Sequence, residues 1–159
     1  MNRNSVDYIS EFTSLIEFVS SAFNKEVSPD DFQIEDMGVP HERPVELPRG
    51  KMAIYSFIYE GNFLKIGKVK SNGSDARYRY QHYNGGNSST LNNSICADCD
   101  FQAAIGLELE KSTAGAWIMK NCRRVNILFD ANLGDTFLGL VEREAHHRYK
   151  PKYEGRKQS

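Results

Sequence analysis

The chain has 159 residues, 40% of them hydrophobic, which is enough for one domain with a single core. No segment approaches the roughly 20 consecutive apolar residues of a transmembrane helix, and the N-terminus lacks the apolar run of a signal peptide. Three cysteines, an odd number, argue against a disulfide framework. We therefore expect a cytoplasmic protein without a membrane segment.

The formal net charge of -1 conceals two segments of opposite charge. Residues 1–48 carry ten acidic and three basic side chains, whereas residues 49–159 carry eleven acidic and seventeen basic ones. The cationic second segment suits a polyanionic ligand such as nucleic acid. Attraction between the two segments within the fold explains the same pattern, so composition leaves both interpretations open.

Apolar residues recur at steps of three and four between Val6 and Phe23, which predicts an amphipathic helix. We expect this helix to pack on the core, with recruitment of a protein partner as the alternative. The stretch up to Pro48 contains several prolines and few apolar residues. We interpret residues 1–48 as an N-terminal helix with a proline-containing acidic linker or wrapping arm, and residues 49–159 as the main domain.

A β-hairpin is predicted next. Two runs rich in β-branched and aromatic residues, 52–59 and 63–69, flank the turn signal Glu60-Gly61-Asn62. After a loop, Ser74-Asp75 offers a side-chain cap to a new helix, and Arg77 falls in the first turn of that helix.

The rest of the chain alternates between short helices and strands. We expect the arginine helix to end at the glycine pair near residues 84–87. The segments predicted after it are a short helix over 88–99, a strand or irregular connection over 101–110, a helix over 112–124, a buried strand over 124–130, and a last long helix from 135 or 136 to about 148.

The hairpin and the helix after it carry a family resemblance. The strands contain Ala53-Ile54-Tyr55 and Lys65-Ile66-Gly67, and Arg77 and Gln81-His82-Tyr83 follow. This order resembles the stand-alone and restriction-type GIY-YIG nucleases, with alanine in place of the first glycine and lysine in place of the second tyrosine. It implies an α/β (α+β) fold with a small, mostly antiparallel sheet of the three-stranded type, flanked by helices.

The resemblance resumes near the C-terminus and spans roughly residues 51–156. Leu140-Val141-Glu142 is similar to the glutamate helix of the family, and Lys150-Pro151-Lys152-Tyr153 to the exit from that helix. Glu154 stands where the family often has an asparagine. Glu142 and Glu144 both lie at the margin of the apolar arc of the helix, so periodicity does not choose between them. Only the family-like distance to the exit favours Glu142.

The resemblance implies a metal-dependent endonuclease, whose reaction needs an activated water, a cation and a proton for the departing 3′-oxygen. Tyr55 would accept a proton from the water or position it, and Lys65 would bind the water or favour the ionised phenol through its charge. Arg77 would bind the phosphate with its planar fork. Glu142 would hold one Mg²⁺ or Mn²⁺, and His82 would transfer a proton or contact the phosphate.

Nucleic-acid contacts are expected on the basic residues of the same region, Lys68, Lys70 and Arg79. The resemblance favours double-stranded DNA over RNA, and base specificity would come from the loops 72–74 or 85–93. Cleavage of both strands would need a homodimer or sequential nicking. Restriction, phage defence and repair are all compatible with such an activity.

Other interpretations remain. Taken singly, Tyr55 is typical of a core residue, Lys65 of a solvated strand and Arg77 of a helix surface. The departures at Lys65 and Glu154 are compatible with a noncatalytic nucleic-acid-binding module, and the N-terminal helix with a protein-interaction domain. The Cys96-x-x-Cys99 pair also permits a zinc site, but a second ligand pair at regular spacing is missing, so thiols without metal are the simpler interpretation.

Overall fold

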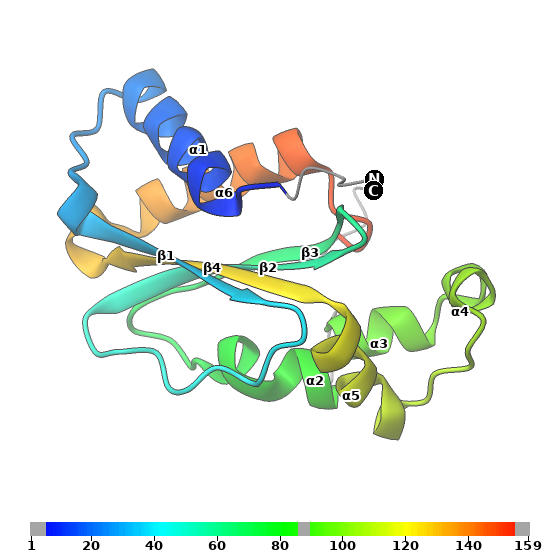
Figure 1. Ribbon diagram of the computed structural model, residues 1–159. Helices are drawn as coiled ribbons and strands as arrows, with labels where there is room; N and C mark the ends of the chain where they lie inside the picture. The colour runs from blue at the N-terminus through cyan, green and yellow to red at the C-terminus, as the bar shows by residue number, and fades with distance from the viewer. Residues whose placement is uncertain (1–5, 86–89, 155–159) are drawn as a thin grey trace, which may run out of the picture.

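The computed structural model describes residues 6–85 and 90–154, and in this part of the chain it is an α+β fold of three layers (Figure 1). A four-stranded antiparallel sheet in the order β1-β4-β2-β3 lies between two layers of helices. The strands are β1 (Phe32–Gly38), β2 (Lys51–Tyr59), β3 (Asn62–Val69) and β4 (Arg123–Asp130). The helices are α1 (Tyr8–Ala22), α2 (His82–Asn84), α3 (Leu91–Cys96), α4 (Cys99–Ile105), α5 (Lys111–Asn121) and α6 (Asp135–Tyr149), with the short turns η1 (Pro29–Asp31), η2 (Arg77–Gln81) and η3 (Ala131–Leu133).

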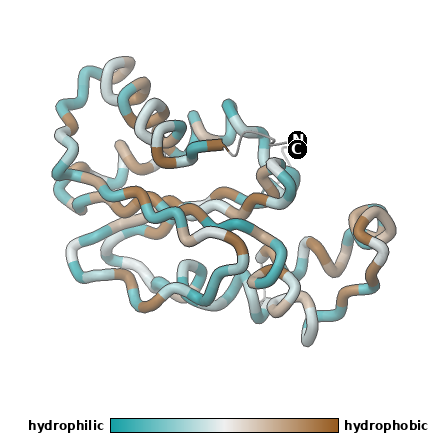
Figure 2. Tube along the Cα trace, viewed as in Figure 1, coloured by the Kyte–Doolittle hydropathy of each residue, from teal (hydrophilic) through white to brown (hydrophobic). Residues whose placement is uncertain are grey.

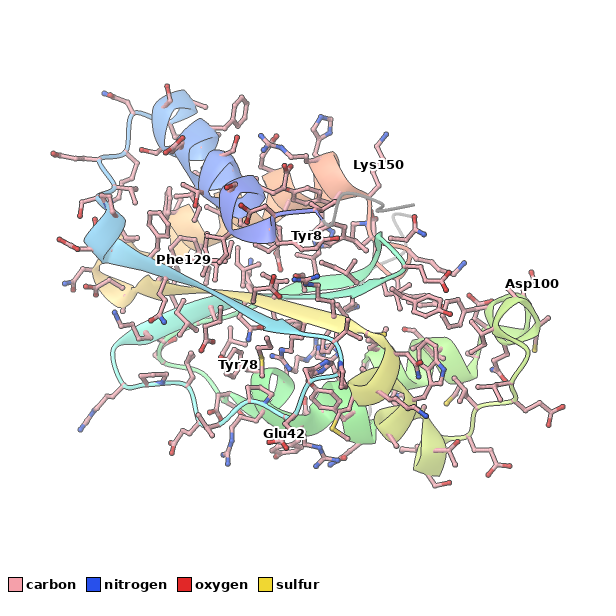
Figure 3. The ribbon with its side chains drawn as sticks, viewed as in Figure 1. Tyr8, Glu42, Tyr78, Asp100, Phe129 and Lys150 are labelled. Atoms are coloured by element: carbon pink, nitrogen blue, oxygen red, sulfur yellow. The ribbon has the colours of Figure 1, made fainter. Side chains whose placement is uncertain are left out.

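Each face of the sheet has its own hydrophobic core. Helices α1 and α6 cover one face, and α2, α3 and α5 cover the other, with α4 to the side of this second layer (Figure 1). Tyr8 lies on the α1 side of the sheet and Tyr78 on the α2 side (Figure 3). Hydrophobic residues run along the strands between the two layers (Figure 2). Burial on both faces explains why β2 and β4 are nearly continuous apolar runs.

The sheet has one strand more than the three-stranded type expected, and the additional strand lies in the predicted linker. β1 pairs with β4, from Phe32 opposite Phe129 to Gly38 opposite Arg124. Phe32 and Ile34 alternate with polar residues and pack against the core of the α1 face, as a half-buried strand requires. The prolines around this segment conceal the alternation, so a strand within residues 28–48, interpreted as a linker or wrapping arm, was not predicted.

The rest of this segment, residues 39–48, contains no helix or strand and is fixed by hydrogen bonds to the α2 and α5 layer. The backbone N–H of His41 donates to the carbonyl of Met119 at 2.8 Å, and the N–H of Leu47 donates to the carboxylate of Asp75 at 3.1 Å.

The other predicted elements compare closely with the structure. The N-terminal helix, the hairpin, the helix around Trp117, the strand over 124–130 and the last helix are confirmed. The strand or irregular connection expected over 101–110 was wrong for its first half, because α4 extends to Ile105 and only the residues after it are irregular. The side chain of Asp98 caps α4 by accepting from the N–H of Phe101, a local signal that starts a helix. Residues 86–89 and 155–159, which include parts of the predicted cap and tail, lie outside the described residues.

A β-bulge in β3 decides which face Lys65 occupies. Phe57 pairs with Lys65, whereas Ile58 pairs with Phe63, so Leu64 is the extra residue. Leu64 and Lys65 therefore both face the α2 side, whereas strict alternation would send them to opposite faces. The bulge brings the lysine to the same face as Tyr55.

Candidate active site

Tyr55 and Gly67 are partners in the β2–β3 ladder of the hairpin. The tyrosine ring lies across the glycine, where a Cβ atom would overlap Oη and Cζ of Tyr55. The glycine of the second triplet thus provides the space that the phenol occupies. Tyr55 is 1% exposed, and burial raises the pKa of its hydroxyl to about 12, opposed by the positive charges of Arg77 and Arg124.

His82 fixes the direction of the hydrogen bond at the Tyr55 hydroxyl. Its Nε2 lies 2.7 Å from Tyr55 Oη, and its Nδ1 accepts from the backbone N–H of Leu91 at 2.9 Å. Burial holds the pKa of His82 well below its usual value, so the ring is neutral and carries one proton. That proton must be on Nε2, because Nδ1 is an acceptor. His82 therefore donates to Tyr55, which favours the ionised phenol rather than removing its proton.

Lys65 places an amine in the interior beside these two rings. The residue is 3% exposed, and its Nζ has no hydrogen-bond partner among the described residues. Burial lowers the pKa of Lys65, the charge of Arg77 lowers it further, and Glu142 opposes both effects. A buried amine without an acceptor is costly, and a phosphate oxygen is a ligand that would satisfy it.

Arg77 begins η2, a π-helical turn that leads directly into α2 and so places Arg77 and His82 on one continuous segment. Arg77 is half-buried and lowers the pKa of Tyr55 through both its charge and a side-chain hydrogen bond. The hydroxyl of Tyr55 thus lies between a histidine donor and a guanidinium.

Glu142 reaches this cluster from the opposite layer. It lies on α6, which packs on the other face of the sheet and along the edge strand β3, and its carboxylate is 3.4 Å from Nζ of Lys68. His146 Nε2, one turn further along α6, is 3.0 Å from the carbonyl oxygen of Ile66 in the same strand. The charge of Glu142 nevertheless acts on both Tyr55 and Lys65. The candidate site therefore straddles the β3 edge.

Glu144, the alternative carboxylate, faces elsewhere. It pairs with Arg148 of the next turn at 3.7 Å, whereas Glu142 pairs with Lys68 of β3. The structure thus distinguishes two glutamates that periodicity could not.

Glu142 is the carboxylate at this site that could contact a hard divalent cation. Its side chain is 21% exposed and lines an open groove of about 450 Å³ with Glu154, Arg143, His146 and His147. One or two carboxylates with water and phosphate oxygens suffice for Mg²⁺, although the amine of Lys68 would have to yield part of its contact. In the described part of the chain, no group of three or more histidine, cysteine, aspartate or glutamate side chains is arranged around a common point.

The predicted nucleic-acid residues lie on the surface beside the site. Lys68 is half-buried in its ion pair with Glu142, Lys70 is exposed, and Arg79 is exposed 3.9 Å from Asp75. Lys70 also lines a groove of about 560 Å³ together with Arg49 and Lys51, which sequence reasoning did not single out, and with the acidic residues Glu46 and Asp75.

Sequence reasoning also missed Arg124, a fully buried arginine on β4 next to Tyr55. The available signal was a charged residue inside a predicted buried strand, which is rare without a functional or structural reason.

No helix in residues 6–85 and 90–154 has the length and apolar character needed to cross a membrane. No protein-family model, curated protein or solved structure matches the chain.

Proposed function

We propose that this protein is a metal-dependent endonuclease that hydrolyses DNA phosphodiester bonds, with a GIY-YIG-like active site at the edge of β3. The main support is the Tyr55 hydroxyl, which accepts a hydrogen bond from Nε2 of His82 and interacts with Arg77. The amine of Lys65, which has no hydrogen-bond partner within residues 6–85 and 90–154, lies in the same cluster. The carboxylate of Glu142 acts on that amine through its charge. These residue types are the ones that phosphodiester hydrolysis needs.

In this proposal the phosphate approaches from the side where Arg77, Lys68 and Glu142 are half-exposed, because Tyr55 and Lys65 are buried. Arg77 binds two phosphate oxygens with its planar fork. The amine of Lys65 donates to the phosphate or the attacking water. Tyr55 takes the proton of that water when its hydroxyl is ionised, a form that His82 and Arg77 favour against the burial that raises its pKa.

Glu142 is the residue that would hold a divalent cation, and Glu154 lines the same groove. A cation held there would supply positive charge to the phosphate and the departing oxygen. Lys68, which pairs with Glu142 at 3.4 Å, provides a positive charge for a neighbouring phosphate.

The second candidate is a noncatalytic nucleic-acid-binding module. Two observations favour it: Tyr55 is almost completely buried, and Lys68 already neutralises Glu142. The protein-interaction alternative has less support, because Phe12, Ile16 and Val19 of α1 are buried inside the protein, and only the ends of the apolar stripe, Ile9 and Phe23, are exposed.

The test compares Glu142→Gln with its matched control Glu144→Gln on supercoiled DNA, linear duplex DNA and RNA, with Mg²⁺ or Mn²⁺. We expect wild-type protein and Glu144→Gln to cleave DNA at rates within about threefold of each other, because the Glu144 pair is on the surface. Glu142→Gln should be slower by about 100-fold or more while still binding. Binding without cleavage by all three proteins would establish the noncatalytic module instead, and cleavage of RNA alone would change the substrate.

A further inference from the structure

Arg124 is a buried cation enclosed by aromatic rings. It is 0% exposed, and its guanidinium carbon lies 5.7 Å from the ring centre of Tyr55, 5.0 Å from Phe57, 4.9 Å from Tyr78 and 5.8 Å from Tyr83. A cation over aromatic faces is attracted by their quadrupoles, but the rings do not neutralise its charge.

The hydrogen bonds of Arg124 go to neutral acceptors. Nε donates to Oδ1 of Asn126 at 2.9 Å, Nη1 to the hydroxyl of Tyr83 at 2.9 Å, and Nη2 to the carbonyl of Tyr78 at 2.7 Å. Among residues 6–85 and 90–154, no carboxylate forms an ion pair with it. A buried arginine usually has such a partner, because an uncompensated interior charge is costly.

The hydroxyl of Tyr83 stays neutral, so it does not compensate the positive charge of Arg124. His41 Nδ1 lies 2.8 Å from the carbonyl oxygen of Cys122, so it carries the proton of the neutral ring, and Nε2 accepts from Tyr83 at 2.9 Å. Tyr83 therefore donates its own proton to His41 while it accepts from Arg124. Burial raises the pKa of Tyr83, so it remains a neutral phenol beside the guanidinium.

We propose that Arg124 is a positioning residue whose fixed positive charge, behind the Tyr55 ring, stabilises the negative charge that forms on the Tyr55 hydroxyl during hydrolysis. This inference rests on the proposed nuclease function and adds a residue outside the resemblance. Arg124 is opposite Phe57 and Asn126 opposite Tyr55 in the β2–β4 ladder, so both residues face the same side of the sheet as the phenol.

Several charged or titratable groups surround Tyr55, and Arg124 is distinct among them. They are His82 and Arg77 from the α2 segment, Lys65 from β3, Glu142 from α6 and Arg124 from β4. Of the cations, Arg77 and Lys65 have roles at the phosphate, where the substrate's own charge compensates them. Arg124 is sealed behind the ring and binds no substrate, so its charge is available to the phenol throughout the reaction.

The experiment changes the charge in two ways and measures Tyr55 directly. Arg124→Met removes the cation. Asn126→Asp keeps the arginine and places a carboxylate of nearly the same shape at its Nε. Arg124→Lys keeps the charge and serves as the control. Each variant carries 3-fluorotyrosine at position 55, whose ionisation is followed by ¹⁹F NMR without DNA or metal.

We expect Arg124→Met and Asn126→Asp to raise the ionisation midpoint at position 55 by about one pH unit, a tenfold change in the ionised fraction. Arg124→Lys should stay near the wild-type value. In a plot of cleavage rate against pH, the rise on the acid side should shift to higher pH by the same amount as the ionisation midpoint. Should Arg124→Met fail to fold, Arg124→Gln replaces it, because glutamine keeps an N–H donor without the charge. A carboxylate at position 126, directly opposite Tyr55, also acts on the phenol by itself, so Asn126→Asp only supports this comparison.

The inference is overturned if a folded protein without the charge, Arg124→Met or Arg124→Gln, leaves the midpoint at position 55 unchanged, whether or not the protein cleaves DNA. A shifted midpoint in a protein that binds but never cleaves DNA would overturn the proposed function alone, and the electrostatic effect of Arg124 on Tyr55 would remain established.

Discussion

Nε2 of His82 donates to the hydroxyl of Tyr55 across 2.7 Å, and the backbone N–H of Leu91 holds the ring in the tautomer that makes this possible. Residues of a strand, a helical turn and the first residue of α3 are thereby joined in one chain of hydrogen bonds. Because His82 is the donor in the bond to Tyr55, it stabilises the phenolate and does not act as a base toward the phenol.

The direction of this bond predicts different activities for two substitutions of His82. Glutamine keeps an N–H at about the position of Nε2, whereas leucine keeps volume without a donor. Both lose the acceptor for Leu91, so the difference between them reports on the bond to Tyr55. We expect His82→Gln to cleave DNA about tenfold faster than His82→Leu, the effect of one hydrogen bond to a developing charge. Single-turnover rates at equal occupancy of DNA measure it, and equal rates would contradict the assigned direction.

Gly67 should be the least replaceable glycine of the hairpin. A methyl group at this position would overlap the Tyr55 ring, so Gly67→Ala should lower the free energy of unfolding by about 2–4 kcal/mol, as overpacking of a rigid core does. In denaturant unfolding, Tyr55→Leu combined with Gly67→Ala should recover part of this loss. The control is Gly139→Ala on α6, where the nearest atom to a new Cβ is 3.6 Å away and the helix gains from alanine. Additive effects of the two hairpin substitutions would show that the ring is not the obstacle.

Much of the fold could be predicted because its signals are local. The hairpin turn at Gly61, the periodic α6 and the apolar run of β4 each follow from neighbouring residues. β1 could not be recognised in the same way, since seven residues between prolines, six of them half-buried, become a strand only when β4 offers an edge.

The candidate site was less accessible to sequence reasoning. Tyr55, Arg77 and Glu142 were named from their order along the chain, but the face of Lys65 depends on a bulge that shifts the register by one residue. Arg124 is enclosed by four rings drawn from one strand and one helical segment. The face of Lys65 and the rings around Arg124 depend on how the strands and helices pack, so neighbouring residues in the sequence do not reveal them.

Replacement of Lys65 by methionine should raise stability and abolish activity. Its buried amine has no partner among the described residues, so Lys65→Met removes an unsatisfied polar group and keeps most of the side-chain volume. We expect the free energy of unfolding to rise by about 1–3 kcal/mol while DNA cleavage is lost. Lys70→Met, at an exposed position, should leave stability within about 0.5 kcal/mol. A Lys65→Met protein that is less stable than wild type would mean that the amine has a partner in solution.

His41 should make the protein less stable in mild acid. Burial lowers the pKa of His41 to about 4, below the value of about 6.5 expected in the unfolded chain. Above pH 6.5 neither state is protonated there, so His41 contributes no pH dependence. As the pH falls from 6.5 toward 4, the unfolded chain takes up the proton first, and stability is lost by about 1–2 kcal/mol between pH 7 and pH 5.

The pKa of His82 is lowered as well, so His82 also makes the protein less stable in acid. The contribution of His41 must therefore be isolated by substitution. His41→Gln should be less stable than wild type at pH 7, because it loses the bond to Cys122 or Tyr83, yet its stability should fall less steeply on acidification. Urea unfolding at several pH values between 7 and 5 gives both slopes. If His41→Gln and wild type lose stability in parallel, His41 is protonated as readily in the folded protein as in the unfolded chain, and its hydrogen bonds are not those of a neutral ring.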